Sequence, residues 1–166
     1  HPDRSLEDLA GEAFIRALAD AGCTAPQIGI AYYSGMTNGT LQGQISIPGQ
    51  VIFSKIGIEG IPVYNVENAC ASGSSAFNLA VQSLKAGTAD VALAIGAEKM
   101  NIPDKAKAFA IFEGGWDVAR AEQNAVTLLK MGEGITPPPG TTSDKPYSKF
   151  MDIYAASARN HMKKYG

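Results

Sequence analysis

The chain has 166 residues, of which 45% are hydrophobic, with a mean hydropathy near zero and a formal net charge of −2. This composition is ordinary for a soluble globular protein and is enough for one domain with a real core. The charges are balanced and form no basic block, so nothing points to nucleic acid or an anionic membrane as a partner. No apolar run reaches the length of a membrane span, and the cysteine usage leads us to expect a reducing, cytoplasmic location.

The predicted elements begin with a helix that Ser5 caps and Gly22 ends, with leucine, alanine and phenylalanine along one face. A strand is predicted over 28–34, followed by a polar, glycine-rich loop as far as Gly39. Pro48 either begins or kinks the next helix, and a glycine stands at the end of that helix.

The middle of the chain continues this alternation with a strand over 61–66, a helix from Cys70 to about Lys85 and a strand over 91–97. The last strand is continuously apolar, which is typical of a strand covered on both faces. Alternating helices and strands over 6–97 predict a mostly parallel sheet flanked by helices, which is a layered α/β architecture. The loops after the strands then lie along one edge of the sheet, where open α/β sheets bind ligands.

The alternation stops at about Asn101. Residues 102–146 mix short helical pieces with glycine and proline runs, and 147–164 is expected to form a final helix. We therefore predict an α/β domain over 1–101 and an excursion from that domain over 102–166.

Cys70 is the strongest candidate for a functional residue because it stands at a strand-to-helix junction. Free N–H groups and aligned peptide dipoles at a helix start favour a thiolate over a thiol. Residues 71–75 are small and leave the turn open to a substrate carbonyl, as a covalent nucleophile requires. The competing interpretation is a small buried cysteine, which is the commoner role of this residue type.

Other candidate residues carry weaker signals. Cys23, in a loop between a helix and a strand, is interpreted as a small packed residue, and neither His161 nor the terminal His1 is interpreted as a base. Glu67 and Asn68 either order the turn through local bonds to the backbone, which is the favoured interpretation, or contact substrate. No residue set for a metal ion or a bound cofactor is predicted.

The segment Asn65-Val66-Glu67-Asn68-Ala69-Cys70-Ala71-Ser72-Gly73-Ser74 resembles the nucleophile segment of thiolases. The likeness is closest to the sterol carrier protein x type and to the bacterial and archaeal acetyl-CoA acetyltransferase-like proteins. Residues 96–100 are similar to the strand end that follows the nucleophile helix in this family, and residues 161–166 are similar to its loop-domain helix. The resemblance implies a thiolase-like layered α/β fold. It covers the N-terminal half only, without its first strand, and a partial inserted loop domain over 102–166.

The same resemblance implies that Cys70 attacks a 3-oxoacyl-CoA, in thiolysis or in the reverse Claisen condensation, through an acyl-enzyme intermediate. Coenzyme A is then a substrate, no separate cofactor is needed, and the metabolic role is in fatty acids or sterols. In the family, an activating histidine, a second cysteine and glycine-rich oxyanion donors belong to a second half, so this chain alone is expected to be inactive. A homodimer or a dimer of dimers is a further implication.

Two alternatives stay open at this point. A thiolase-like lipid-transfer protein or steroid side-chain aldolase keeps the fold, relies on other catalytic residues and associates with an OB-fold partner. A non-catalytic scaffold half that needs a partner chain is the second alternative, and the sheet edges left by the missing strands favour such association. Thiol-specific alkylation separates these alternatives from a nucleophile, because a nucleophilic Cys70 reacts much faster than Cys23.

Overall fold

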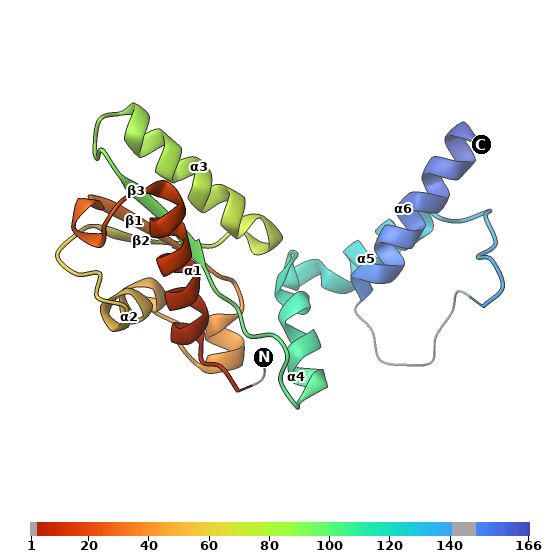
Figure 1. Cartoon of the computed structure of the whole chain (residues 1–166). Helices are drawn as coiled ribbons and strands as arrows, with labels where there is room; N and C mark the ends of the chain where they lie inside the picture. The colour runs from red at the N-terminus through yellow and green to blue at the C-terminus, as the bar shows by residue number, and fades with distance from the viewer. Residues whose placement is uncertain (1–2, 141–148) are drawn as a thin grey trace. The chain divides into compact units, whose positions relative to one another are not determined.

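The structure is a computed structural model that describes residues 3–140 and 149–166. The chain divides into two compact units, His1–Asp104 and Lys105–Gly166 (Figure 1). Within the described residues, all of the β-strands belong to the first unit.

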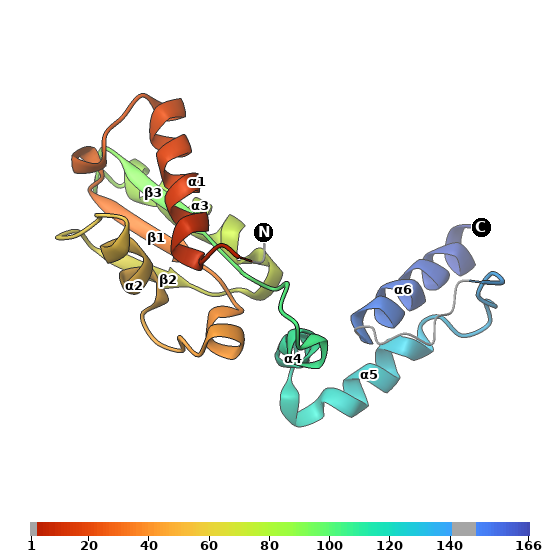
Figure 2. The ribbon, with the colours of Figure 1, turned by 60° about the horizontal axis from the view of Figure 1, so that its bottom comes forward.

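The first unit is built on a parallel sheet of three strands, β1 (Ile30–Ser34), β2 (Val63–Val66) and β3 (Ala92–Gly96). Their order is β2-β1-β3, so β1 lies in the middle, as Figure 2 shows. Every residue of β1 is buried, whereas β2 and β3 form the two edges of this sheet. The predicted parallel sheet is therefore confirmed.

Helices cover both faces of the sheet. One face packs against α1 (Leu6–Ala21) and α2 (Pro48–Lys55), and the other packs against α3 (Ser72–Lys85) (Figure 1). Both clusters take side chains from β1 and from the apolar strand β3, because successive residues of a strand point to opposite faces. These three layers confirm the layered α/β prediction.

The first helix shows why its ends were predictable. The Asp8 N–H donates to Ser5 Oγ at 3.1 Å, and the Ser5 N–H donates to Asp8 Oδ2 at 2.9 Å, which completes a reciprocal cap. Gly22 ends the helix in the left-handed conformation, with a φ of 64°.

The segment between α1 and α2 differs from the prediction in two places, and the structure decides between the two roles predicted for Pro48. The first strand begins at Ile30 because Ala25–Gln27 forms a 3-10 turn ahead of it. The predicted loop after this strand contains a single π-helical turn, Asn38–Gln42, which Gly43 ends with a φ of 79°. Pro48 begins α2 and does not kink it, as its missing N–H allows at a first helical position.

The face of α3 that packs on the sheet does not carry the largest apolar residues of this helix. Phe77 and Leu84 are 66% and 43% exposed. The packed face consists of small side chains at helical spacing: Ser72, Ala76, Ala80 and Ser83. Small residues are needed because Tyr32 projects from β1 into this layer, and its hydroxyl lies 2.6 Å from Ser83 Oγ in a hydrogen bond.

Gly49, in the first turn of α2, lies too close to the sheet to carry a side chain. A Cβ atom there would lie 2.6 Å from Tyr33 Cβ and 2.7 Å from Asn65 Oδ1. We predict that Gly49→Ala lowers the free energy of unfolding by about 1–3 kcal/mol through overpacking, as measured by urea denaturation. Gly73→Ala is the matched control, since a Cβ atom added at Gly73 would meet nothing within 4 Å, and an equal loss in both variants would contradict the prediction.

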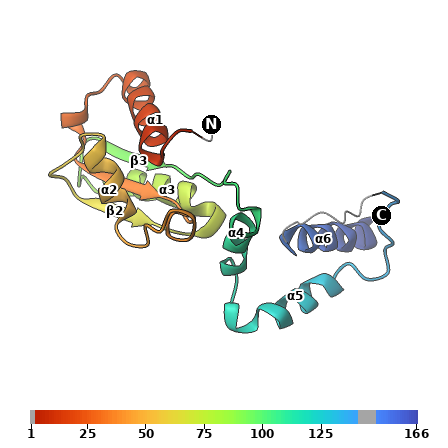
Figure 3. The ribbon, with the colours of Figure 1, turned by 90° about the horizontal axis from the view of Figure 1, so that it is seen from below.

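The second unit contains α4 (Lys105–Ala110), α5 (Ala121–Lys130) and α6 (Lys149–Tyr165), with short 3-10 turns between the first two. Helices α5 and α6 lie side by side (Figure 3). The sequence placed the start of the last helix at residue 147, which lies outside the described residues. None of the helices in the described part of the chain is long and apolar enough to cross a bilayer.

Candidate nucleophile site

Cys70 lies on a tight turn between β2 and α3, at the carboxyl edge of the parallel sheet. The turn is a 3-10 segment, Ala69–Ala71, and α3 begins at Ser72, so the cysteine precedes the α-helix by two residues and does not open it. The thiol is free and its residue is exposed, so Cys70 is not packed in the core. A reagent or a substrate carbonyl therefore has access to the residue from solvent.

The residue before the cysteine has a strained backbone. Ala69 has a φ of 45°, a left-handed conformation that residues with a Cβ rarely adopt. Two bonds hold it there: the Ala69 N–H donates to Glu67 Oε1 at 2.6 Å, and the Ser72 hydroxyl donates to the Ala69 carbonyl at 2.7 Å. The strained conformation at Ala69 sets the direction from which Cys70 leaves the sheet.

Two further bonds fix the same turn from the side of Asn68. Its N–H donates to Ser72 Oγ at 2.9 Å, and its side-chain amide donates to Ser75 Oγ at 3.0 Å. Glu67 and Asn68 thus order the turn through local bonds, as the favoured interpretation of the sequence predicted.

The segment that follows β3 binds the loop that follows β1. Glu98 Oε1 accepts hydrogen bonds from the backbone N–H groups of Met36 at 2.6 Å and Thr37 at 3.2 Å. The Gln42 side chain donates to the Lys99 carbonyl at 3.2 Å. In the sequence, Glu98 stood out only as part of a family-like segment, and its role was missed because its partners are about sixty residues away in the chain.

A cavity of 240 Å³ lies between this loop and the end of β2. Its lining includes Gly35 and Asn38 from the loop and Glu67 from the segment that leads to Cys70. Because Glu67 also bonds the amide next to Cys70, the cavity adjoins the cysteine-bearing turn. No sequence pattern indicated this cavity.

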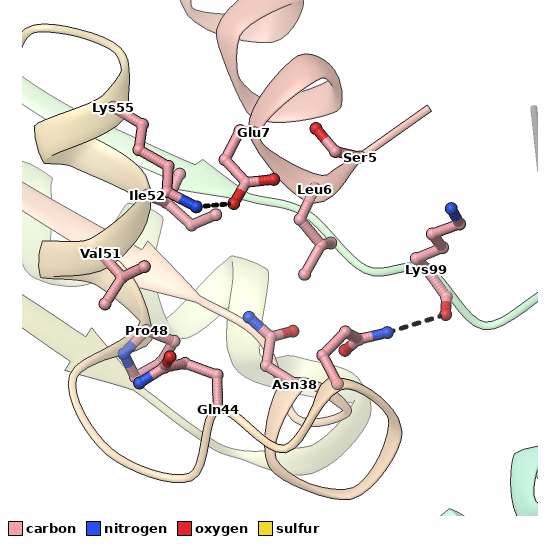
Figure 4. Close-up of a pocket in the computed structure, with 11 residues that line it drawn as sticks. Ser5, Leu6, Glu7, Asn38, Gln44, Pro48, Val51, Ile52, Lys55 and Lys99 are labelled. Carbon is pink, nitrogen blue, oxygen red and sulfur yellow. Dashed lines mark hydrogen bonds and ion pairs between the residues drawn. The ribbon is translucent and has the colours of Figure 1, made fainter. Parts of the chain in front are cut away.

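A second cavity, of 330 Å³, lies between α1, α2 and the π-helical turn (Figure 4). An ion pair between Glu7 and Lys55 borders it. The hydrogen bond from Lys55 is the main cause that lowers the pKa of Glu7 from its ordinary value. Asn38 and Gln44 line this cavity as well as the first one.

The remaining sequence candidates lie elsewhere. Cys23 is a half-buried free thiol in the connection that leads to the amino end of β1, so the parallel topology places it at the edge of the sheet opposite Cys70. His161 is exposed on α6 beside the Tyr165 ring, at 4.7 Å between ring centroids, and His1 is outside the described residues. The described residues contain no group of three His, Cys, Asp or Glu that could hold a metal ion.

In this layered α/β unit, a parallel strand leads through a strained, cysteine-bearing turn into a helix. This arrangement defines a protein of the thiolase type. The chain belongs to the thiolase family, since the model of the thiolase N-terminal domain matches residues 1–135. The resemblance seen in the sequence is confirmed by this match.

Individual relatives agree with that assignment. The chain is 33% identical over 163 residues to human sterol carrier protein 2, covering 98% of this chain and 26% of that protein. It is 30% identical over 165 residues to non-specific lipid-transfer protein-like 2 of Caenorhabditis elegans, covering 99% and 36%. It is 29% identical over 166 residues to an acetyl-CoA acetyltransferase of Methanothermobacter thermautotrophicus, again covering 99% and 36%. The chain therefore spans between 26% and 36% of the length of these curated relatives.

Proposed function

We propose that this chain supplies the nucleophile-bearing half of a thiolase-type acyl-CoA acyltransferase, and that Cys70 is the residue that takes the acyl group. The observation that carries the proposal is the exposed cysteine on a strained turn at the carboxyl edge of the sheet. Membership of the thiolase family and the similarity to an acetyl-CoA acetyltransferase support it.

In the proposed thiolysis, the Cys70 sulfur attacks the 3-oxo carbon of a 3-oxoacyl-CoA. A sulfur–carbon bond forms, the bond between carbons 2 and 3 breaks, and the electron pair leaves on acetyl-CoA, which is then protonated. The thiol of a second coenzyme A takes the acyl group from Cys70. The Cys70 N–H stands at the second position of the 3-10 turn Ala69–Ala71, where a backbone N–H has no acceptor within the turn. It is therefore suited to bind the developing oxyanion, a contribution of about 2.7–4 kcal/mol.

The proposal places the proton-transfer groups on another α/β half, in the same protein or in a partner chain. The outer face of α3 supports this, because the exposed Phe77 and Leu84 and the half-buried Val81 follow one another at helical spacing. A second half packed on this face would bring its groups toward the helix that follows Cys70. A homodimer or a dimer of dimers, an acyl-CoA substrate and a cytoplasmic location belong to the same proposal.

A second candidate function is lipid transfer or steroid side-chain cleavage without an acyl-enzyme. The relatives whose names are sterol carrier protein 2 and non-specific lipid-transfer protein-like 2 favour it. In that case Cys70 is not acylated, and the chain acts as a subunit or scaffold for a partner such as an OB-fold protein. Acylation of Cys70 by an acyl-CoA therefore separates the two candidates.

Thiol labelling gives a first check of accessibility. We predict that iodoacetamide at neutral pH modifies Cys70 severalfold faster than Cys23, because Cys70 is exposed and Cys23 is half-buried. Peptide mass spectrometry measures both rates in one sample, and the urea-unfolded chain, in which the rates converge, is the control. Equal or slower labelling of Cys70 in the folded chain would contradict the prediction.

A further inference from the structure

Asn38 carries a buried hydrogen-bond acceptor without a donor. The residue is 3% exposed, and its Oδ1 atom has no hydrogen-bond partner in the structure. Its amide nitrogen donates to the Tyr33 hydroxyl at 2.7 Å, and that hydroxyl donates to the Ala97 carbonyl at 3.0 Å. Because the phenol uses its only hydrogen on Ala97, the amide must offer its N–H to the phenol, and its oxygen faces elsewhere.

The protonation state of Tyr33 fixes the direction of these two hydrogen bonds. Burial, with the Glu98 carboxylate adding to it, raises the pKa of Tyr33, so the phenol stays protonated at neutral pH. A buried carbonyl oxygen left without a donor is unfavourable, and such atoms in folded proteins are nearly always satisfied. A donor from outside the chain, such as a water molecule or a ligand hydroxyl, would therefore satisfy the oxygen of Asn38.

The 240 Å³ cavity offers room for that donor. Gly35 lines it, and a Cβ atom at Gly35 would lie 3.2 Å from Asn38 Oδ1, so this oxygen lies directly behind the part of the cavity wall that Gly35 forms. Most of the remaining lining is apolar, with side chains such as Met36, Ile45 and Val66. The volume corresponds to about eight waters at their liquid density, which is the size of a short chain.

The cavity also lies within reach of the cysteine. Glu67 lines it and stands three residues before Cys70, so the two Cα atoms are at most about 11 Å apart. The Glu67 carboxylate accepts a bond from the Ala69 N–H, which is the neighbour of Cys70. The turn that carries Cys70 and the wall of the cavity therefore share Glu67.

We propose that this cavity receives the acyl chain of the substrate and that Asn38 Oδ1 accepts a hydrogen bond from a hydroxyl group on that chain. Asn38 then determines specificity, and the preferred substrates are thioesters of short hydroxylated acids. The inference rests on the proposed function, since it assigns the acyl chain of the same reaction.

The test compares two thioesters of N-acetylcysteamine, one carrying a hexanoyl group and the other a 6-hydroxyhexanoyl group. In either transfer the Cys70 sulfur bonds the carbonyl carbon, the original carbon–sulfur bond breaks, and the cysteamine thiolate leaves and takes a proton. Both probes carry the same amide arm, so the ratio of their rates reports on the hydroxyl alone. We expect the full chain to acylate Cys70 about two- to twelve-fold faster from the hydroxylated probe, the factor that one hydrogen bond contributes.

Three variants assign the preference to Asn38. Asn38→Leu removes the acceptor, so the rate ratio falls to about one. Gly35→Ala crowds the oxygen and keeps the bond between Asn38 and Tyr33, so it lowers the ratio even where Asn38→Leu fails to fold. Val51→Ala is the matched control, because Val51 in α2 lines the other cavity and not this one, and its truncation should leave the ratio unchanged.

The inference would be overturned if the wild-type rate ratio is one. It would also be overturned if the ratio keeps its wild-type value in both Asn38→Leu and Gly35→Ala. If neither probe acylates Cys70, the proposed function fails. Binding of a hydroxyl group in the cavity is then measured separately, by saturation-transfer NMR with 1,6-hexanediol. A signal in the wild type that Asn38→Leu or Gly35→Ala removes upholds the hydroxyl site. Absence of any signal in the wild type rejects it.

Discussion

Replacing Cys70 with alanine is expected to abolish transfer of an acetyl group from acetyl-CoA to this chain. The loss should be about 10³-fold or more, because removing a covalent nucleophile removes the whole reaction path and not one contact within it. Intact mass spectrometry measures the acetylated fraction over time. The half-reaction is the right assay, since it involves no carbon–carbon bond, and at a pH of about 9 an ordinary thiol is ionised without the activating histidine of a second half.

Cys23→Ala is the matched control for this experiment. It deletes the other free thiol at the opposite edge of the sheet, so acetylation should continue at the wild-type rate. Near-ultraviolet circular dichroism of both variants verifies that the fold is retained. If Cys70→Ala keeps its acetylation, or if Cys23→Ala loses it, the assignment of the nucleophile is wrong.

Phe53→Ala is expected to have the largest effect on stability. Phe53 is fully buried in α2, and its ring packs edge-to-face on Tyr33 with the centroids 6.0 Å apart. Deleting a buried phenylalanine side chain costs about 3–5 kcal/mol, which is a large share of the roughly 5–15 kcal/mol by which a domain is stable. Urea denaturation should therefore show a much lower midpoint, with part of the population unfolded in buffer.

The same deletion at Phe77 gives a matched control. Phe77 is 66% exposed on α3, so Phe77→Ala should change the free energy of unfolding by only about 0.5 kcal/mol. Similar losses in the two variants would mean that the core lies elsewhere, or that a partner covers α3 in the sample. Sedimentation at two protein concentrations distinguishes these explanations.

Much of the fold was predictable because its signals are local. The cap formed by Ser5 and Asp8, the glycine that ends α1 and the alternation of apolar elements each depend on residues close together in sequence. The strand-to-helix turn around Cys70 was predictable for the same reason, since Glu67 and Asn68 bond to residues at most seven positions away. Local patterns thus located the candidate nucleophile correctly at the sheet edge.

The features that sequence patterns missed depend on residues far apart in the chain. The packed face of α3 is set by Tyr32, fifty-one residues before its partner Ser83, so the sequence of the helix alone does not reveal it. Asn38 looked like an ordinary loop residue, because its importance comes from Tyr33, Ala97 and the space at Gly35. No pattern within the segment 35–44 signals either the π-helical turn or the cavity.

The most direct measurement of the central proposal is peptide mapping of the chain after incubation with acetyl-CoA. The account predicts an acetyl group on the Cys70 peptide, bound as a thioester that hydroxylamine removes, and formed faster in the folded chain than in the urea-unfolded chain. Acetylation of lysines alone, or equal acetylation of both cysteines at the unfolded rate, would contradict it.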